Sequence, residues 1–544
     1  MSESEGTMTT GATGAGRGAD RLASLVTWDA DWAGLRVVVA GIGASGFSAA
    51  DTLVELGAAV VVVDAGADEE NEARAETLRI VGAREVLLGA GHAASLPLVD
   101  GRPAELVVTS PGWRPTQPLL AAAAADGIPI WGDVELAWRV RIREGRPTAD
   151  WLTITGTNGK TTTVGLTESM LLASGRRAIA AGNVGIPLLD VIRDPQGYDV
   201  LAVELSSFQL HWAHSISPLA SVCLNVAEDH VDWHGSYEAY VAAKASVYER
   251  TRIACIYNVE QRETEIMVEN ADVIEGCRAV GFTTGTPSIS MVGVVEDLLV
   301  DRAFIAQRKD SAAELAALPD LGTVVPRHLV ADALAAAALV RAAGVEPAAV
   351  REGIRAFRPG DHRIQVVGDE DGILWIDDSK ATNPHAAAAS LASFESVVWI
   401  AGGLSKGVSY DDLVRDHGRR LRAVVLLGVD PTPLQDALAR HAPEVPVLVH
   451  PAQRASADPA ADPAGDATAE AAGDPTADRE PPTGEAVMHW AVAEAAGLAR
   501  QGDTVLMAPA AASMDQFSSY AHRGAAFTAA VAARSGQGSG EGAS

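Results

Sequence analysis

The stretch "WLTITGTNGKTTTVGLTESMLLASG" (151–175) decides the fold. Its first part is an apolar run typical of a buried strand, its middle is a Gly-rich turn, and its last part has the apolar spacing of a helix. A strand that passes through a tight turn into a helix is the repeating unit of a parallel sheet. The same order recurs on both sides of this stretch, so we expect an α/β protein built from several such units.

The Gly-rich turn inside this stretch predicts a phosphate site. Backbone N–H groups of such a loop, together with the N-terminus of the helix that follows, attract an anion. We expect Lys160 to reach the β- and γ-phosphates of a nucleotide and Thr161 to offer its hydroxyl to Mg²⁺. The usual spacing of the motif is broken because Ile154 stands where its first glycine is expected. Gly156 and Gly159 are still present, so we expect the loop to turn its backbone N–H groups toward a phosphate as the usual motif does.

A second Gly-rich turn lies upstream, in "LRVVVAGIGASGFSAA" (35–50). Gly41, Gly43 and Gly46 form a G-x-G-x-x-G pattern, and Asp64 ends the next apolar run. Alone, this pattern indicates a dinucleotide site and therefore a nicotinamide-dependent oxidoreductase. Two other interpretations stay open: a different phosphate-bearing ligand such as a sugar nucleotide, or glycines that serve only close packing of strand on helix.

Polar residues follow two further apolar runs of the central region. Glu204 ends one of them, and a carboxylate near a phosphate loop is a natural ligand for the hard ion Mg²⁺. His230 follows the other, and in open α/β sheets ligands bind where such strands end. The spacings His230/His234 and His211/His214 also make a zinc site conceivable, although no third ligand stands out. Otherwise these histidines are partly buried or surface residues.

A third α/β region follows the turn-rich segment "FRPGDHRIQ" (357–365). Lys406 comes after a Gly-Gly pair at a strand end, which suits a mobile loop that pairs with a carboxylate. Residues 451–486 contain no Val, Ile, Leu, Met or aromatic residue and carry eight acids against two arginines. Such a composition cannot bury a core, so we expect a disordered insertion on the surface.

Composition excludes several classes of function. The 544 residues include 42 Lys and Arg against 71 Asp and Glu, a formal net charge of −29, which argues against nucleic-acid binding and against docking on anionic membranes. The three cysteines have no metal-binding spacing, which is typical of reduced thiols in the cytosol. No signal peptide and no membrane span is expected, and we predict a cytoplasmic protein.

Several motifs together carry a resemblance to a known family. They are, in chain order, "GTNGKTTT", "AGNVG" (181–185), "VELSSFQL", "NVAEDHVDWH", "YVAAK", "GDHRI", "DDSKATNP", "GGLSKG" and "SMDQFSSYAHRG". In order and spacing the chain resembles the Mur ligases of peptidoglycan synthesis, from residue 35 to about 532 apart from the insertion. "DDSKATNP" and "SMDQF" are typical of the members that add D-glutamate.

The resemblance implies three α/β domains: an N-terminal Rossmann-like domain, a central P-loop-type ATPase domain with a parallel sheet, and a C-terminal Rossmann-like domain. We expect the UDP-substrate domain at 31–147, the ATP domain at 148–358 and the amino-acid domain at 359–534. The predicted flanking and inserted segments are a flexible extension at 1–30, the disordered insertion at 451–486 and a flexible tail at 535–544. The implied activity joins D-glutamate to UDP-N-acetylmuramoyl-L-alanine through an acyl phosphate, with ATP, two Mg²⁺ ions and a carbamylated Lys244. A monomer is expected.

The resemblance also implies roles for individual residues. The catalytic residues would be Lys160, Glu204, His230 and Lys244, and the metal ligands Thr161, Glu204, His230 and the carbamate of Lys244. ATP would be bound by Gly156, Thr157, Asn158, Gly159, Lys160, Thr161, Thr162, Arg363, Asp378 and Lys380. The UDP substrate would contact Ala44, Ser45, Asp64, Gly112, Asn183 and His230. D-glutamate would contact Thr382, Lys406, Ser513, Met514 and Tyr520.

The sequence departs from the family at one helix. The family often has "HNxxN" near the adenine, whereas this chain reads "HLVAD" (328–332), with Leu329 and Asp332 in place of the two amides. Two alternative functions remain: a sister amide ligase for another amino acid, such as a folylpolyglutamate synthase, and a nicotinamide oxidoreductase or non-catalytic nucleotide-binding module.

Overall fold

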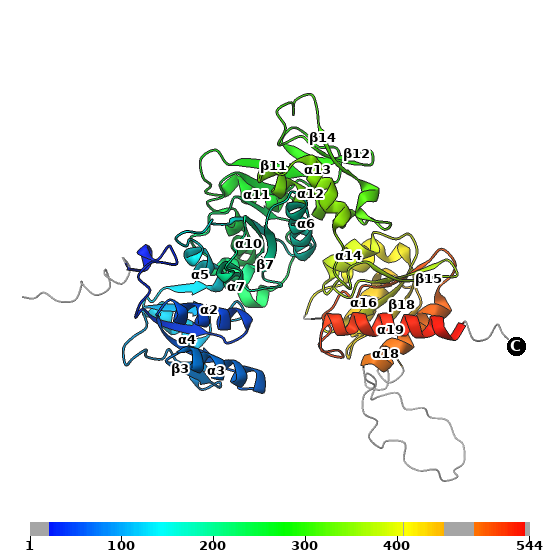
Figure 1. The fold of residues 1–544 in the computed structure, drawn as a ribbon. Helices are drawn as coiled ribbons and strands as arrows, with labels where there is room; N and C mark the ends of the chain where they lie inside the picture. The colour runs from blue at the N-terminus through cyan, green and yellow to red at the C-terminus, as the bar shows by residue number, and fades with distance from the viewer. Residues whose placement is uncertain (1–20, 406, 451–483, 539–544) are drawn as a thin grey trace, which may run out of the picture. The chain divides into compact units, whose positions relative to one another are not determined.

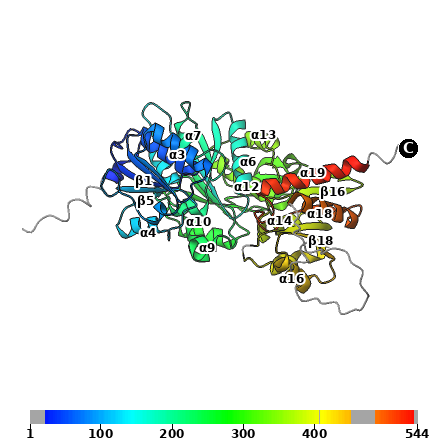
Figure 2. The same cartoon turned by 90° about the horizontal axis from the view of Figure 1, so that it is seen from below.

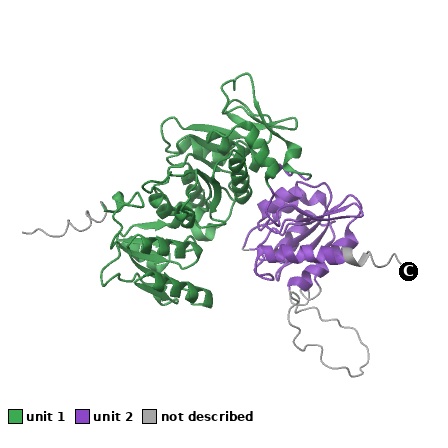
Figure 3. Ribbon diagram, in the orientation of Figure 1, with its two compact units in different colours: residues 1–323, 329–357 green, residues 324–328, 358–544 purple. Residues whose placement is uncertain are grey.

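The computed structural model describes residues 21–405, 407–450 and 484–538, with side chains as far as 534. The chain divides into two compact units, one of residues 1–323 with 329–357 and one of residues 324–328 with 358–544 (Figure 3). The first unit contains two sheets and the second contains one, so three α/β sheets follow one another along the chain (Figure 1). Among the described residues, no helix has the length and apolar character needed to cross a membrane.

The first sheet has five parallel strands in the order β3-β2-β1-β4-β5. This is the strand order of a Rossmann-type half, in which ligands bind beyond the carboxyl ends of the strands. Its strands are β1 (Arg36–Ala40), β2 (Ala59–Asp64), β3 (Glu85–Leu88), β4 (Leu106–Thr109) and β5 (Ile130–Gly132). Its helices are α2 (Ala44–Glu55), α3 (Glu69–Val81), α4 (Pro118–Ala125) and α5 (Asp133–Val140), with the short η1 (His92–Ala94).

The second sheet has nine strands in the order β14-β13-β12-β11-β10-β9-β6-β8-β7, parallel from β7 to β12 and antiparallel beyond. Its strands are β6 (Asp150–Thr155), β7 (Ala178–Gly182), β8 (Val200–Glu204), β9 (Ala220–Cys223), β10 (Ala254–Asn258), β11 (Arg278–Phe282), β12 (Met291–Val295), β13 (Leu298–Asp301) and β14 (Ala313–Ala317). Its helices are α6 (Lys160–Ala173), α7 (Leu188–Arg193), α8 (Ser207–His211), α9 (Val231–His234), α10 (Tyr237–Ala245), α11 (Arg262–Asn270), α12 (Arg327–Ala342) and α13 (Pro347–Ala356), with η2 (Ser246–Tyr248) and η3 (Leu318–Leu321).

The third sheet has the order β15-β16-β20-β17-β18-β19, and only β15 is antiparallel to its neighbour. In β17, Trp399 packs into the core on one face and Val398 into the core on the other, so both faces are buried and the run is continuously apolar. The strands are β15 (Gln365–Glu370), β16 (Ile373–Asp377), β17 (Val397–Gly402), β18 (Leu421–Leu427), β19 (Val447–Val449) and β20 (Thr504–Met507). The helices are α14 (Pro384–Leu391), α15 (Asp411–His417), α16 (Thr432–His441), α18 (Gly484–Leu498) and α19 (Tyr520–Gly538), with η4 (Gly418–Arg420) (Figure 2).

The flexible N-terminal extension predicted for residues 1–30 is wrong for residues 21–30. Leu22 and Leu25 are only 6% and 0% exposed, and Arg139 donates hydrogen bonds to both of their carbonyl oxygens. The Trp28 N–H also donates to the Ile142 carbonyl at 2.8 Å. Two apolar side chains spaced three residues apart, Leu22 and Leu25, pack this short segment against the unit that contains α5. This spacing was the available signal, but the Gly- and Ala-rich composition of the preceding residues obscured it.

Two other predicted segments are shorter than expected. The predicted insertion (451–486) includes residues 484–486, which begin α18, because Glu485 favours a first helical turn and the apolar spacing continues behind it. The predicted tail (535–544) includes residues 535–538, which complete α19. Residues 1–20, 451–483 and 539–544 lie outside the described residues. The boundaries of the three predicted domains stay predictions.

We expect Gly353→Ala to lower the free energy of unfolding by about 1–3 kcal/mol, because α13 crosses α6 at this residue and leaves no space for a methyl group. A Cβ on Gly353 would lie 2.4 Å from the Cα of Met170. Gly497→Ala is the matched control, since that glycine also lies in a helix and a Cβ there meets nothing within 4 Å. Denaturant unfolding followed by circular dichroism measures both variants. A Gly353→Ala variant as stable as Gly497→Ala would contradict this packing.

Candidate active site

The phosphate loop predicted from the sequence joins β6 to α6. Gly156 and Gly159 have φ angles of 155° and 84°, which favour glycine over any residue with a side chain. The Lys160 ammonium donates to the carbonyl oxygens of Gly156 and Thr157, each at 2.9 Å. The turn of the loop is therefore formed, and hydrogen bonds hold the Lys160 ammonium against the loop at the N-terminus of α6.

A second segment holds this loop from the neighbouring strand end. The Asn158 N–H donates to Oδ1 of Asn225 at 2.8 Å, and the Asn225 side-chain amide donates back to the Asn158 carbonyl at 3.0 Å. The Thr157 hydroxyl lies 2.8 Å from the Tyr240 hydroxyl. Sequence reasoning missed Asn225 and Tyr240, because their contacts join segments about 70 and 80 residues apart that only the folded sheet brings together.

Glu204 lies at the end of β8, where it is paired in register with Ile154 of β6. It is 1% exposed, and Asn183 donates to it twice, from its backbone N–H to the Glu204 carbonyl and from its amide to Oε1, both at 2.9 Å. The other carboxylate oxygen, Oε2, is buried and has no hydrogen-bond partner among the described residues. A buried acceptor without a donor beside a phosphate loop fits a cation, and its hard oxygen suits Mg²⁺.

Lys244 reaches the same loop from α10. Its side chain is buried, and its amine donates to the Gly156 carbonyl at 2.8 Å. Burial, and then the nearby positive charge of Lys160, lower the pKa of Lys244 to about 7. Near neutral pH a large fraction of this amine is therefore uncharged and nucleophilic, which is the form that adds CO₂. Lys160 and Lys244 therefore both contact the Gly156 carbonyl, and Glu204 lies on the neighbouring strand, in register with Ile154.

The four histidines considered for zinc do not form a ligand set. His230 has a φ of 53° at the start of α9, and its ring lies 4.8 Å from that of Phe208. Nε2 of His234 lies 2.9 Å from the Ser207 hydroxyl, and burial lowers the pKa of His234 to about 4. Within residues 21–450 and 484–534, apart from 406, no group of three or more His, Cys, Asp or Glu side chains is arranged to hold a metal ion.

The upstream Gly-rich turn is held by Asp64. Its carboxylate accepts from the Ile42 N–H at 2.8 Å and from the Gly66 N–H at 2.7 Å. A Cβ on Gly46 would lie 2.0 Å from the Gly41 carbonyl, so this glycine serves close packing of helix on strand. Gly43 instead faces open space at the start of α2, beside the predicted substrate residues. Those residues are Ala44 and Ser45 in the first turn of α2, and Gly112, which is exposed after β4.

Asp133 connects the upstream Gly-rich turn with a segment of the second sheet. Its role was not predicted from the sequence. Its carboxyl accepts from the Gln209 amide at 3.2 Å, while its Oδ1 has no partner among the described residues. Burial raises its pKa, against the opposing effects of Gln209 and of the Ser45 hydroxyl. The "GD" pair directly after the short apolar run "IPIW" (128–131) was the available signal. Asp133 therefore lies between a predicted substrate residue and the segment that follows Glu204.

Asp332, at the departure from the family pattern, lies against the phosphate loop. It is 5% exposed, and a Cβ on Gly159 would lie 2.3 Å from its Oδ1. Leu329 is also buried. Glycine at position 159 is therefore required by this close approach as well as by its φ angle.

The remaining predicted site residues belong to the second unit. Asp378, Lys380 and Thr382 follow β16, and Ser513 follows β20, its neighbour in the sheet. Burial raises the pKa of Asp378 to about 6, and the Ser390 hydroxyl donates to its carboxylate. The charge of Arg363 acts on Asp378 in the opposite direction.

The Lys380 ammonium lies 3.9 Å from the centre of the Tyr520 ring, a cation–π contact at the start of α19. Buried Arg523, which sequence reasoning missed, donates to the Ser379 hydroxyl at 3.0 Å and to the Ala511 carbonyl at 3.1 Å. It thereby joins the loops after β16 and β20. Met514 is 76% exposed, and Lys406 lies outside the described residues.

Three family descriptions match successive parts of the chain. "Mur ligase MurD-like, N-terminal domain" matches residues 35–132, "Mur ligase middle domain" matches 154–340, and "Mur ligase, glutamate ligase domain" matches 362–511. The three matched ranges contain the three sheets in order, except that residues 150–153 of β6 precede the second range.

Curated relatives match over nearly the same length. The UDP-N-acetylmuramoylalanine–D-glutamate ligase of Leifsonia xyli is 51% identical over 538 residues, covering 96% of this chain and 98% of the relative. The protein of the same name from Streptomyces avermitilis is 52% identical, covering 92% and 98%. Among solved structures, the MurF ligase of Thermotoga maritima in complex with ADP shares the fold, with a TM-score of 0.50 at 15% identity, covering 88% of this chain and 96% of that one.

Proposed function

Because the chain belongs to the Mur ligase family, we propose that it joins D-glutamate to UDP-N-acetylmuramoyl-L-alanine with hydrolysis of ATP to ADP and phosphate. The relatives named above carry this activity in their names, and they match the chain at about half of all positions. The product is a cytoplasmic precursor of the cell wall. One observation carries the proposal: Lys160 and Lys244 both donate to the Gly156 carbonyl beside the buried carboxylate of Glu204.

The reaction requires two anions, a carboxylate and a triphosphate, to approach each other. An oxygen of the substrate carboxylate attacks the γ-phosphorus, the bond to the β-phosphate oxygen breaks, and ADP leaves an acyl phosphate behind. The amine of D-glutamate then attacks the acyl carbon, loses a proton, and expels inorganic phosphate as the amide forms. The protein contributes mainly by positioning the reactants and neutralising their charge.

Each group at Gly156 suits one part of this task. The Lys160 ammonium offsets charge on the β- and γ-phosphates, and the N–H groups at the start of α6 donate hydrogen bonds to phosphate oxygens. Mg²⁺, when bound, would supply further neutralisation of the phosphate charge and make phosphorus more electrophilic. Thr161, Glu204 and His230 are the protein groups that we assign to two such ions. Asn183 orients Glu204 through its amide.

We assign the fourth metal-binding group to a carbamate on Lys244. The uncharged amine attacks CO₂, a nitrogen–carbon bond forms, and one proton leaves. The carbamate nitrogen keeps a hydrogen, so it can still donate to the Gly156 carbonyl. The modification replaces a cation that would repel Mg²⁺ with two anionic oxygens.

In the second unit we assign nucleotide contacts to Arg363, Asp378 and Lys380, and the D-glutamate pocket to the remaining predicted residues. These are Thr382, Lys406, Ser513, Met514 and Tyr520. Bound D-glutamate carries two carboxylates, and Lys406 is the cation of this set that we assign to one of them.

The experiment that tests the proposal measures phosphate release with ATP, Mg²⁺ and UDP-N-acetylmuramoyl-L-alanine, with each D- and L-amino acid added in turn. We expect D-glutamate alone to support turnover, at a rate at least about 10²-fold above L-glutamate, since a pocket built for one stereoisomer leaves polar groups unpaired with the other. Omitting either co-substrate should abolish release. Turnover with another amino acid would identify a sister amide ligase instead.

A further inference from the structure

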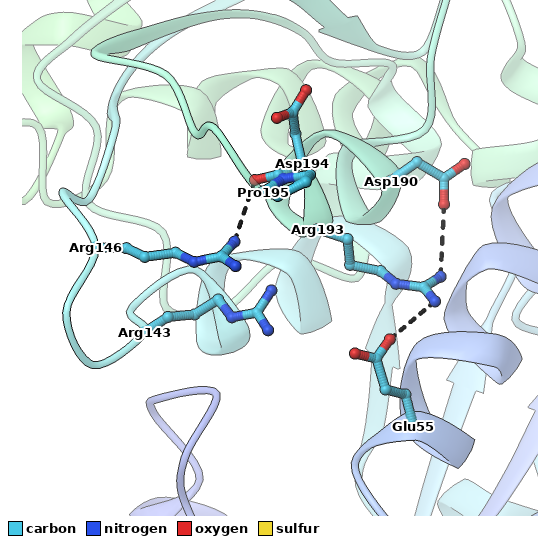
Figure 4. Close-up of a pocket in the computed structure, with 7 residues that line it drawn as sticks. All are labelled: Glu55, Arg143, Arg146, Asp190, Arg193, Asp194 and Pro195. Carbon is cyan, nitrogen blue, oxygen red and sulfur yellow. Dashed lines mark hydrogen bonds and ion pairs between the residues drawn. The ribbon is translucent and has the colours of Figure 1, made fainter.

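The first unit has a hollow of about 560 Å³ that none of the predicted site residues lines (Figure 4). It lies among the end of α2, the end of α7 and the turn of residues 143–146, which connects α5 of the first sheet to β6 of the second. Its lining residues are Glu55, Arg143, Arg146, Asp190, Arg193, Asp194 and Pro195. Three arginines therefore meet in one hollow of a chain whose net charge is −29.

The acids of the hollow are already paired. Arg193 binds Asp51 at 2.5 Å and Glu55 at 2.8 Å, so two acids of the unit share its single positive charge. Asp190 accepts from the Ser48 hydroxyl at 2.5 Å and also lies 4.0 Å from Arg193.

Asp194 is satisfied by its own turn. Its two carboxylate oxygens accept from the Gln196 N–H at 2.7 Å and from the Tyr198 hydroxyl at 3.2 Å. These bonds lower its pKa, the first of them most strongly. Its carboxylate points away from Arg143 and Arg146 (Figure 4).

Arg143 and Arg146 form no ion pair within the described residues. The Arg146 N–H donates to the Arg143 carbonyl at 3.3 Å, which closes a turn with Gly145 at a φ of 73° and directs both side chains to one side (Figure 4). Arg146 donates one side-chain hydrogen bond, to the Asp194 carbonyl at 3.2 Å. The Arg143 guanidinium lies 3.8 Å from the centre of the Trp28 ring and, within the described residues, donates no hydrogen bond. Burial, and then the charge of Arg146, lower the pKa of Arg143, while the charges of Glu55 and Asp29 act in the opposite direction.

We propose that this hollow binds a phosphate-bearing anion between Arg143 and Arg146. A guanidinium offers paired N–H donors whose spacing matches two phosphate oxygens, and two adjacent guanidiniums favour a dianion or a diphosphate over a single carboxylate. The bound anion would relieve the repulsion between the two cations. Since α2 belongs to the first sheet and α7 to the second, it would also stabilise their junction.

The test titrates inorganic pyrophosphate into the full chain, without Mg²⁺ and with EDTA, by isothermal titration calorimetry. We expect the double variant Arg143→Ala/Arg146→Ala to lose one binding site that the wild type has, or to bind there at least about 10-fold more weakly. Arg84→Ala/Arg415→Ala is the control, because it removes the same charge from two exposed arginines outside the hollow, and it should bind as the wild type does. Identical isotherms for the wild type and the double variant in the hollow would overturn the proposal.

A local signal separates this hollow from the two Gly-rich turns. Because Arg143 covers Trp28, pyrophosphate should change the tryptophan fluorescence of the wild type, and Trp28→Phe should remove that component. Arg143→Lys/Arg146→Lys keeps both charges but not the paired donors, and should weaken binding several-fold while the fold is kept.

Repeating the titration with UDP and with ADP distinguishes a nucleotide diphosphate from free phosphate. No Trp28 signal with any of these ligands would reject the site.

Discussion

Replacing Lys244 with alanine is expected to lower kcat by at least about 10³-fold. The variant would lose the proposed carbamate as a metal ligand, and it would also lose the hydrogen bond from the Lys244 nitrogen to the Gly156 carbonyl of the phosphate loop. Added bicarbonate should not restore turnover, since alanine has no amine to modify. Phosphate release at saturating ATP, UDP-substrate and D-glutamate measures the loss.

Lys309→Ala is the matched control, because Lys309 is an exposed lysine in the same unit. It should retain wild-type kcat. Circular dichroism shows whether Lys244→Ala is folded, and full activity in a folded Lys244→Ala variant would remove this residue from the mechanism.

The same lysine predicts a pH dependence with a definite sign. Its pKa is lowered to about 7, so the amine is protonated below that pH and uncharged above it. In protein depleted of CO₂, the rate of reactivation at a fixed concentration of dissolved CO₂ should fall as the pH drops below about 7 and level off above it. An ordinary exposed lysine would show reactivation still rising towards pH 10.

Glu204→Gln is expected to lower kcat by about 10²–10³-fold and to raise the Mg²⁺ concentration needed for half-maximal rate. The amide oxygen can still accept from Asn183, so the fold of the strand end should persist. What is lost is the charge at Oε2, the buried oxygen without a partner in the described residues.

Glu168→Gln provides the comparison, because Glu168 of α6 accepts from the Ala180 N–H of β7 at 2.9 Å and has no proposed role in catalysis. It should leave the Mg²⁺ titration unchanged. If both variants shift that titration equally, Glu204 is not a metal ligand.

The parts of the site that sequence reasoning located are those fixed by local chemistry. Lys160 follows a glycine loop between a strand and a helix, and Glu204 ends an apolar run, so both positions follow from the element in which they lie. Lys244 is different: by itself it reads as a helix lysine, and only the surrounding motif suggested a role. Its burial against Gly156 depends on how α10 packs.

The residues that sequence reasoning missed depend on distant contacts. Asn225 and Tyr240 meet the phosphate loop only because β9 and α10 lie beside β6 in the folded sheet. Asp133 meets Gln209 across 76 positions of the chain. The packed segment at 21–30 was missed for another reason. The burial of two leucines holds this segment in place, although the residues around them have a composition typical of a flexible chain.

The most direct test of the central claim follows oxygen from the substrate into phosphate. UDP-N-acetylmuramoyl-L-alanine labelled with ¹⁸O in its carboxylate is converted with ATP and D-glutamate, and the released phosphate is analysed by mass spectrometry. We expect one ¹⁸O atom in each phosphate, because the carboxylate oxygen that attacks phosphorus leaves with it. Unlabelled phosphate from a reaction that still forms the amide would contradict an acyl phosphate and, with it, the proposed use of the Gly156 site.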